Sequence, residues 1–205
     1  VNFDDAMGIL EAGAFKDCSS LEIANFAETT LATIGYEAFA GCTSLKEIYI
    51  PETLSDIGDF AFANTKFKEI EFGKNINAVG ANAFAGNTAL EAIYVVSNNK
   101  EFSCIDGVLY NKKGTALVTF PAGKTGTYEL PQNVEEIRAY AFKNSKLTKL
   151  ALAEEPAIRY IGVNAFEDSL IEEIEIGANV EKINSNTFKN AKKLSKVTFN
   201  EGLKY

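Results

Sequence analysis

The stretch that decides the fold is IGYEAFAGCTSLKEIYIP, residues 34–51. Its Ala-Phe pair, preceded by an aliphatic residue four positions before the alanine, recurs along the chain. The phenylalanines of these copies are Phe15, Phe39, Phe62, Phe84, Phe142, Phe166 and Phe188. Within the two uninterrupted runs their spacing is 22 to 24 residues. A period of this length indicates a solenoid of stacked repeats.

A second block of the form L-x-x-I-x-I follows each Ala-Phe pair, as in Leu45-Lys46-Glu47-Ile48-Tyr49-Ile50. Its last three residues alternate apolar, polar, apolar, which is the period of a β-strand. Stacked copies place each isoleucine over its equivalent, about 4.8 Å away, and bury side chains that one repeat cannot bury alone.

We therefore predict an α/β repeat solenoid, a right-handed leucine-rich-repeat superhelix that is mainly parallel β. The strand blocks are expected to form one sheet over a continuous core. The phenylalanines are expected to be buried in the opposite wall, on short helical turns made by the Ala-Phe pairs.

The 58 residues that separate Phe84 from Phe142 contain no Ala-Phe pair and depart from the pattern. Two apolar runs, Cys104–Tyr110 and Thr115–Pro121, flank the turn sequence Asn111-Lys112-Lys113-Gly114. Apolar runs on either side of such a turn predict a β-hairpin.

The irregular segment can be aligned with the repeats on either side. We align Val118–Phe120 with the strand residues Ile93–Val95, one repeat earlier, and Tyr128–Pro131 with the following strand end. Residues 97–131 are therefore interpreted as variant repeats, one of which contains the hairpin. We predict that residues 1–205 form a single leucine-rich repeat solenoid domain.

The composition excludes several classes of function. The chain carries 20 basic and 28 acidic residues, a net charge of −8, which argues against binding nucleic acid or an anionic membrane surface. It has no histidine, the commonest general base and metal ligand, and no tryptophan. No run approaches 18 apolar residues, so no membrane insertion is predicted for this segment. We predict a protein that is not an enzyme and needs neither metal nor cofactor.

The recurring pattern I-G-x-x-A-F-x-x-C-x-S-L-x-x-I-x-I-P resembles the BspA-like leucine-rich repeat, and residues 34–51 match it almost letter for letter. Residues 105–111 and 117–124 are similar to a variant repeat of such proteins from gut and oral anaerobes. The resemblance covers essentially the whole chain. It implies a secreted or surface-anchored bacterial protein with a role in adhesion or host-protein binding, and it supplies no catalytic residues. Arg138 and Asn184 stand where glycine is usual, a departure that affects packing.

Cys18 and Cys42 occupy equivalent positions in neighbouring repeats, 24 residues apart. Adjacent coils can bring such residues within bonding range, so a disulfide is one interpretation. The other is a buried column of small apolar residues, because asparagine replaces cysteine in later copies. We expect both cysteines to be reduced and buried.

The outward positions of the predicted sheet carry the candidate binding residues. The middle position of I-x-I gives Tyr49, Glu71 and Tyr94, and the position two residues earlier gives Glu47 and Glu69. Exposed aromatic residues flanked by charge are typical of interface hot spots. The alternative is that tyrosine is simply common on exposed strand faces.

We therefore predict a monomeric, non-catalytic protein-binding module at the bacterial cell surface or outside the cell. Its partner is an unidentified protein, for example a host extracellular protein, and the carboxylates of the column favour a basic one. The alternative function is a structural spacer or stalk that presents another domain. A clustered aromatic patch on one face indicates the binder, and a uniformly charged face indicates the spacer.

Overall fold

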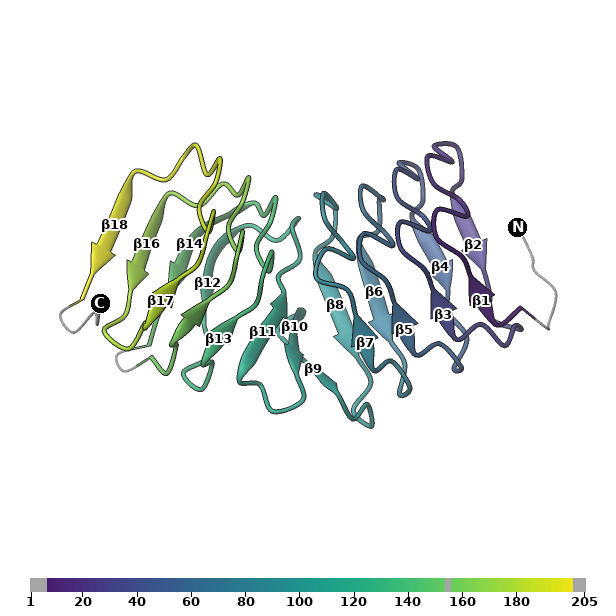
Figure 1. The fold of residues 1–205 in the computed structure, drawn as a ribbon, viewed down its shortest axis with the longest axis horizontal. Coiled ribbons are helices and arrows are strands. Elements are labelled where there is room, and N and C mark those ends of the chain that lie inside the picture. The colour runs from purple at the N-terminus through teal and green to yellow at the C-terminus, as the bar shows by residue number, and fades with distance from the viewer. Residues whose placement is uncertain (1–6, 154–155, 201–205) are drawn as a thin grey trace.

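The L-x-x-I-x-I blocks form strands that stack into a β-solenoid (Figure 1). The computed structural model describes residues 7–153 and 156–200. Equivalent strands of neighbouring coils pair in parallel, as predicted. The strands of this long-strand face are β2 (Ile23–Asn25), β4 (Glu47–Tyr49), β6 (Glu69–Phe72), β8 (Ala92–Val95), β12 (Gly126–Glu129), β14 (Leu147–Ala151), β16 (Glu173–Ile176) and β18 (Lys196–Phe199).

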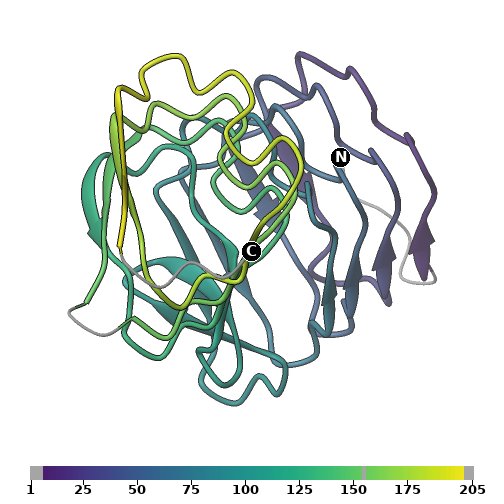
Figure 2. The ribbon, with the colours of Figure 1, turned by 60° about the vertical axis from the view of Figure 1, so that its left-hand side comes forward.

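A second set of strands precedes each Ala-Phe pair and forms another face of the coils. These strands have two residues each and also pair in parallel. They are β1 (Ile9–Leu10), β3 (Thr33–Ile34), β5 (Asp56–Ile57), β7 (Ala78–Val79), β13 (Glu136–Ile137), β15 (Tyr160–Ile161) and β17 (Lys182–Ile183). In the oblique view of Figure 2, successive coils stack one behind another.

The Ala-Phe pairs lie in tight turns, and the predicted helical turns are wrong: residues 7–153 and 156–200 contain no helix. A helix needs consecutive i to i−4 hydrogen bonds, but here the N–H groups alternate between two kinds of partner. The N–H of Phe39 donates to the next coil at Ala61 O, 2.8 Å away, whereas the N–H of Ala40 donates back to Glu37 O at 3.0 Å. Glu37 has a φ of 54°, so the turn begins with a left-handed residue.

The phenylalanines of the turns stack in ladders. Their predicted burial is confirmed for Phe39, Phe62, Phe84, Phe142 and Phe166, whereas Phe15 and Phe188 are only partly buried. The rings of Phe39 and Phe62 lie 5.5 Å apart and almost parallel, and those of Phe142 and Phe166 lie 4.6 Å apart. One ladder ends at Phe84. The next begins at Phe120, which stacks on Phe142 at 4.8 Å. Among the described residues, the stacked phenylalanines therefore form two separate ladders, one that ends at Phe84 and one that begins at Phe120.

The long strands do not form the single sheet that was predicted. On this face β2 pairs with β4, β6 pairs with β8, and β12, β14, β16 and β18 form a third group. The break between β4 and β6 coincides with a change in the preceding turn. Five residue steps lead from Phe62 to Phe67, whereas six lead from Phe39 to Leu45, and Phe67 is larger than the leucine it replaces.

The irregular segment forms β9 (Phe102–Ile105), β10 (Val108–Asn111) and β11 (Ala116–Thr119). The predicted hairpin is confirmed: β10 and β11 are antiparallel across the 111–114 turn. A second hairpin, which was not predicted, joins β9 to β10. Its turn is Asp106-Gly107, with φ values of 50° and 74°, and Asp-Gly is a preferred pair for two-residue hairpin turns.

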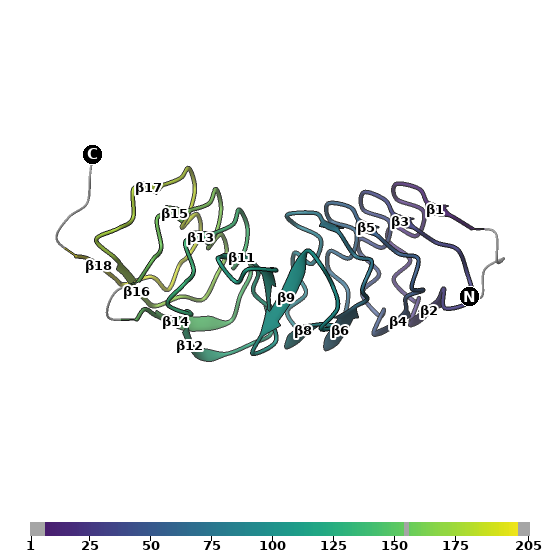
Figure 3. The same ribbon diagram turned by 90° about the horizontal axis from the view of Figure 1, so that it is seen from below.

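The hairpin strands lie across the solenoid between two hydrophobic cores (Figure 3). Leu109 and Val118 pack into the core of the N-terminal half, while Val108, Tyr110 and Leu117 pack into the core of the C-terminal half. We call β10 and β11 together the hairpin wall. The prediction of one continuous core is therefore wrong, because both faces of the wall are buried against different coils.

The alignment of the irregular segment was half right. Tyr128 pairs in register with Leu150, as the predicted strand end requires. The alignment of residues 118–120 with the long strand at 93–95 is wrong. Leu117 instead pairs with Ile137 of the short strand β13, and Phe120 takes the place of an Ala-Phe phenylalanine. The apolar pattern of Val118–Phe120 fits either strand set, so periodicity alone does not separate them.

The hydroxyl groups of Tyr110 and Tyr128 form a hydrogen bond of 2.8 Å inside the C-terminal core. We expect Tyr110→Phe to cost about 1–3 kcal/mol, because it leaves the Tyr128 hydroxyl buried and unpaired. The Tyr110→Phe/Tyr128→Phe double variant is expected to cost less than either single one. A double-mutant cycle by urea unfolding checks this, and additive costs would contradict it.

The same pair makes stability depend on alkaline pH. Burial raises the pKa of Tyr110 and of Tyr128 above the ordinary value of 10.0. Because these pKa values are raised by folding, the pair's contribution is complete below pH 10.0 and is lost as the pH rises toward the folded values. We expect the free energy of unfolding to fall above that pH, less steeply in the double phenylalanine variant.

All three cysteines are free, as predicted for Cys18 and Cys42, but only one of these two is buried. Cys42 lies in the core and its thiol contacts Phe15 O at 3.0 Å. Cys18 is exposed, so the expectation that it is buried is wrong. Cys18 belongs to the first coil that carries an Ala-Phe turn, and no coil with such a turn packs on its other side among the described residues.

The two thiols should therefore differ in reactivity. Burial raises the pKa of the Cys42 thiol to about 11, and the thiolate is the form that reacts. At about pH 8 we expect iodoacetamide to alkylate Cys18 in the native protein and Cys42 only after unfolding. Peptide mass spectrometry with and without urea checks this. Equal labelling of both cysteines in the native state would contradict it.

Candidate interaction face

The five predicted binding residues all lie on the long-strand face and are exposed. Glu47 and Tyr49 lie on β4, Glu69 and Glu71 on β6, and Tyr94 on β8. Tyr49 is 50% exposed and Tyr94 is 43% exposed. Both tyrosines are therefore open to a partner. Because they lie on strands rather than on loops, their backbone is held in place before any partner arrives.

The structure brings these residues together in two groups. Glu71 and Tyr94 lie opposite each other on the paired strands β6 and β8. On β4, the hydroxyl of Tyr49 donates to Glu47 Oε2 at 3.2 Å. Because the predicted single sheet is broken between β4 and β6, Tyr49 lies on a different sheet from Glu71 and Tyr94.

A cleft of about 750 Å³ lies at this break and we call it the β4–β6 cleft. Apolar residues on its walls are Ile48, Ile50, Pro51, Ile70 and Val96, and the acidic ones are Glu47, Glu52, Glu69 and Glu71. Bonds between the two coils close it at both ends. At one end the N–H of Lys66 donates to Leu45 O at 2.8 Å. At the other, Lys74 Nζ lies 2.7 Å from Glu52 Oε2.

Two shallower hollows adjoin the cleft. One, of about 740 Å³, is lined by acidic and basic residues alike, among them Glu47, Glu69 and Glu91 and Lys46, Lys66 and Lys68. The other, of about 950 Å³, lies beside Tyr94 and reaches Asp106 and Lys124, which form an ion pair at 3.0 Å. Glu69 lines the cleft and both hollows, so its carboxylate lies where the three depressions meet.

The cleft has an acidic character because its lysines already have partners. Lys46 donates to Glu22 at 2.9 Å, and this hydrogen bond and charge lower the pKa of Glu22. Lys74 is paired with Glu52, whose pKa is lowered in the same way. Glu47, Glu69 and Glu71 form no ion pair with any residue that the structure describes.

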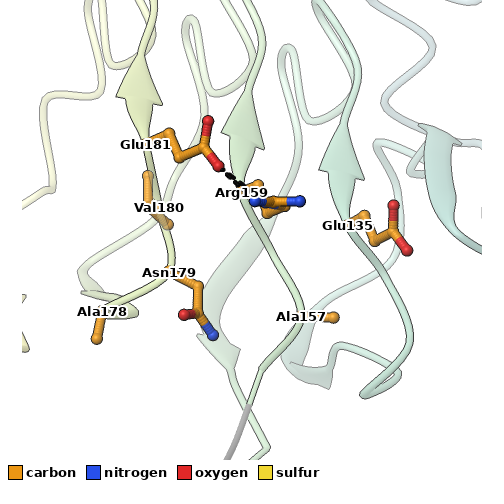
Figure 4. A pocket seen from close by; sticks show the side chains of 7 residues that line it. All are labelled: Glu135, Ala157, Arg159, Ala178, Asn179, Val180 and Glu181. Atoms are coloured by element: carbon orange, nitrogen blue, oxygen red, sulfur yellow. Dashed lines mark hydrogen bonds and ion pairs between the residues drawn. The ribbon is translucent and has the colours of Figure 1, made fainter. Parts of the chain in front are cut away.

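Another hollow, of about 380 Å³, lies on the C-terminal half (Figure 4). In it Arg159 Nη2 lies 2.8 Å from Glu181 Oε1, and Asn179 donates to the backbone carbonyl of Pro156 at 3.0 Å. Since Arg159 already has a carboxylate partner, the described residues that line this hollow offer no free cation to an anionic ligand. Across the described residues, no three Cys, Asp or Glu side chains gather as metal ligands.

Sequence reasoning placed the five side chains on one face of the solenoid, the long-strand face, but missed the cleft between them. The signal that pointed to it was small: the turn before Phe67 is one residue shorter than the turn before Leu45. Such a difference also occurs before Leu147, where β14 remains paired with β12, so it does not predict a break by itself.

The comparisons with known proteins agree with the repeat and the solenoid. A family model described as a BspA type leucine-rich repeat region matches residues 8–125 and 118–205, with 6 copies. The chain belongs to this BspA-type leucine-rich repeat family. A search of curated proteins gave no match. The matching family is a structural repeat, and no catalytic family was identified.

Crystal structures of other leucine-rich repeat proteins resemble this BspA-type solenoid. The pneumococcal vaccine antigen PcpA is 28% identical, with a TM-score of 0.75 over 96% of this chain and 55% of that chain. A leucine-rich cell surface protein from Faecalibacterium prausnitzii is 21% identical, with a TM-score of 0.68 over 92% of this chain and 62% of that one. The chain thus spans less than two thirds of either protein. No helix long and apolar enough to cross a membrane occurs in residues 7–153 or 156–200.

Proposed function

We propose that this chain is a non-catalytic, extracellular protein-binding module that acts in bacterial adhesion or in binding a host protein. The observation that carries the proposal is the pair of half-exposed tyrosines, Tyr49 and Tyr94, on either side of the β4–β6 cleft. Solenoids commonly bind partners on the extended surface of their strands. Tyrosine supplies a large contact area and a hydroxyl group at low entropic cost.

The charge of this face favours a basic partner. Glu47, Glu69 and Glu71 form no ion pair with any described residue, so a basic protein would supply them with countercharges. Charge complementarity of this kind speeds encounter and excludes acidic proteins. The similarity to PcpA and to a leucine-rich cell surface protein supports a location at the cell surface or outside the cell.

The test is a binding screen against an array of host extracellular proteins, repeated with the Tyr49→Ala/Tyr94→Ala double variant. Hot-spot tyrosines contribute about 2 kcal/mol or more each, so we expect the affinity of the double variant to fall at least about 700-fold. The matched control is Tyr36→Ala/Tyr160→Ala, because these tyrosines are equally exposed but lie off the long-strand face. The control should bind like the wild type.

Two results would contradict the proposal. If a partner binds the folded Tyr49→Ala/Tyr94→Ala variant as tightly as the wild type, the binding site lies elsewhere on the solenoid. If no protein on the array binds the wild type, the chain is better described as a spacer that presents another domain.

A further inference from the structure

The β4–β6 cleft separates two strands that stand in equivalent places in successive coils. Paired strands lie about 4.8 Å apart. No Cα atom of β4 lies within 8 Å of a Cα atom of β6. Figure 3 shows β2 beside β4 and β6 beside β8, with a wider separation between the two pairs. The long-strand face is therefore opened between β4 and β6 while the coils remain joined at both ends of the cleft.

Both strands that border the cleft present unpaired backbone groups to it. Along a strand, successive residues direct their N–H and C=O to opposite edges. Tyr49 O accepts from Phe26 of the β2 coil at 2.9 Å, so the groups of Ile48 and Ile50 face the cleft. Phe72 O accepts from Val96 at 3.1 Å, so the groups of Glu69 and Glu71 face it from β6. Two facing edges with free donors and acceptors border one gap.

On β4, the inward side chains also lack a neighbour. Ile48 and Ile50 are only partly buried, whereas Ile174 and Ile176, at the same positions of β16, are 4% and 1% exposed. A Cβ atom added at Gly73, which follows β6, would meet nothing within 4 Å. The difference is that β16 is paired with β14 on one side and β18 on the other. An apolar strip is thus exposed together with the free backbone groups.

We infer that the β4–β6 cleft binds an extended segment of a partner protein, which adds as a β-strand between β4 and β6. This inference rests on the proposed function and specifies how the partner is recognised. Strand addition supplies main-chain hydrogen bonds for affinity, and alternate side chains supply specificity. Here the added strand meets free N–H and C=O groups of β4 on one side and of β6 on the other.

The two faces of the cleft select the sequence of that segment. Side chains that point inward meet Ile48, Ile50 and Ile70, so they are apolar. Side chains that point outward lie among Glu47, Glu69 and Glu71, none of which has a cationic partner in the described chain, so they are basic. The ligand is therefore a short segment in which lysine or arginine alternates with valine or isoleucine.

The free edge of β6 is tested by proline substitution. Proline lacks an N–H and is tolerated at strand edges but not inside a sheet. Glu71→Pro removes only an N–H that faces the cleft, so we expect the melting temperature to change by less than about 2 °C. Glu175→Pro is the matched control in β16, where the equivalent N–H faces the paired strand β14. It should lower the melting temperature by about 6–12 °C. Equal, large losses for both variants would overturn the inference.

The ligand class is tested with synthetic peptides of seven alternating lysine and valine residues, measured by fluorescence anisotropy on the folded protein. A matched peptide with N-methyl groups on alternate amides keeps the charges but cannot donate those hydrogen bonds. We expect it to bind at least about tenfold more weakly. Glu69→Lys/Glu71→Lys should weaken binding by a similar factor, whereas Glu173→Lys/Glu175→Lys on the closed sheet should not.

Each result separates strand addition from the broader function. If the N-methylated peptide binds as tightly as its parent, or if no alternating basic peptide binds, strand addition is overturned. A partner whose binding still depends on Tyr49 and Tyr94 would then leave the proposed protein-binding function in place. Protection of the Ile48, Ile50, Glu69 and Glu71 amides from hydrogen exchange on peptide binding would support strand addition directly.

Discussion

Replacing Phe142 with alanine is expected to lower the free energy of unfolding by about 3–5 kcal/mol. The ring of Phe142 is fully buried and lies between Phe120 at 4.8 Å and Phe166 at 4.6 Å. Truncation therefore removes two stacking contacts and leaves a cavity that the rigid coils cannot close. Urea unfolding followed by circular dichroism measures the loss.

Phe199→Ala is the control, since that ring is 55% exposed on β18. It should change the free energy of unfolding by no more than about 0.5 kcal/mol. If Phe142→Ala unfolds at the wild-type denaturant midpoint, the ladder does not stabilise the solenoid as described.

Replacing Gly162 with alanine is expected to cost about 3 kcal/mol, the upper end of the usual cost of overpacking. An added Cβ atom would lie 2.4 Å from Ala139 N and 2.6 Å from Arg138 C in the preceding coil. Both are backbone atoms and cannot move aside without disturbing the hydrogen bond from Gly162 N to Ile137 O, 2.9 Å long.

Gly73→Ala is the matched control, because its added Cβ atom meets nothing. It should be neutral or stabilising by up to about 1 kcal/mol, since alanine restricts the unfolded chain. Thermal unfolding of the two variants under one set of conditions checks the pair. A loss at Gly73 as large as that at Gly162 would show that crowding between coils is not the cause.

The repeat made most of the fold predictable. Side-chain alternation in stretches such as Glu69–Phe72 fixes which residues face the core, and the recurrence of Phe39 and its equivalents fixes the stacking. Backbone hydrogen bonding is not encoded in that recurrence. An Ala-Phe pair fits a helical turn as well as the observed turn, in which alternate N–H groups donate to the next coil. Only the three-dimensional arrangement of coils distinguishes the two.

The candidate site was predictable in its side chains and not in its shape. The outward positions of I-x-I gave Tyr49, Glu71 and Tyr94, because alternation alone decides which residues face solvent. The cleft between them depends on how far β4 and β6 separate. The short turn before Phe67 accompanies that separation, but an equally short turn before Leu147 leaves β14 paired with β12, so the sequence spacing alone does not give the distance.

In the hairpin wall, the side chains of consecutive residues pack into opposite halves of the solenoid. Val108 packs against the coils that follow it, and Leu109 packs against the coils that precede it. Leu117 and Val118 divide in the same way. Truncating a side chain of β10 or β11 therefore destabilises one half of the solenoid, and the same truncation at the next residue destabilises the other half.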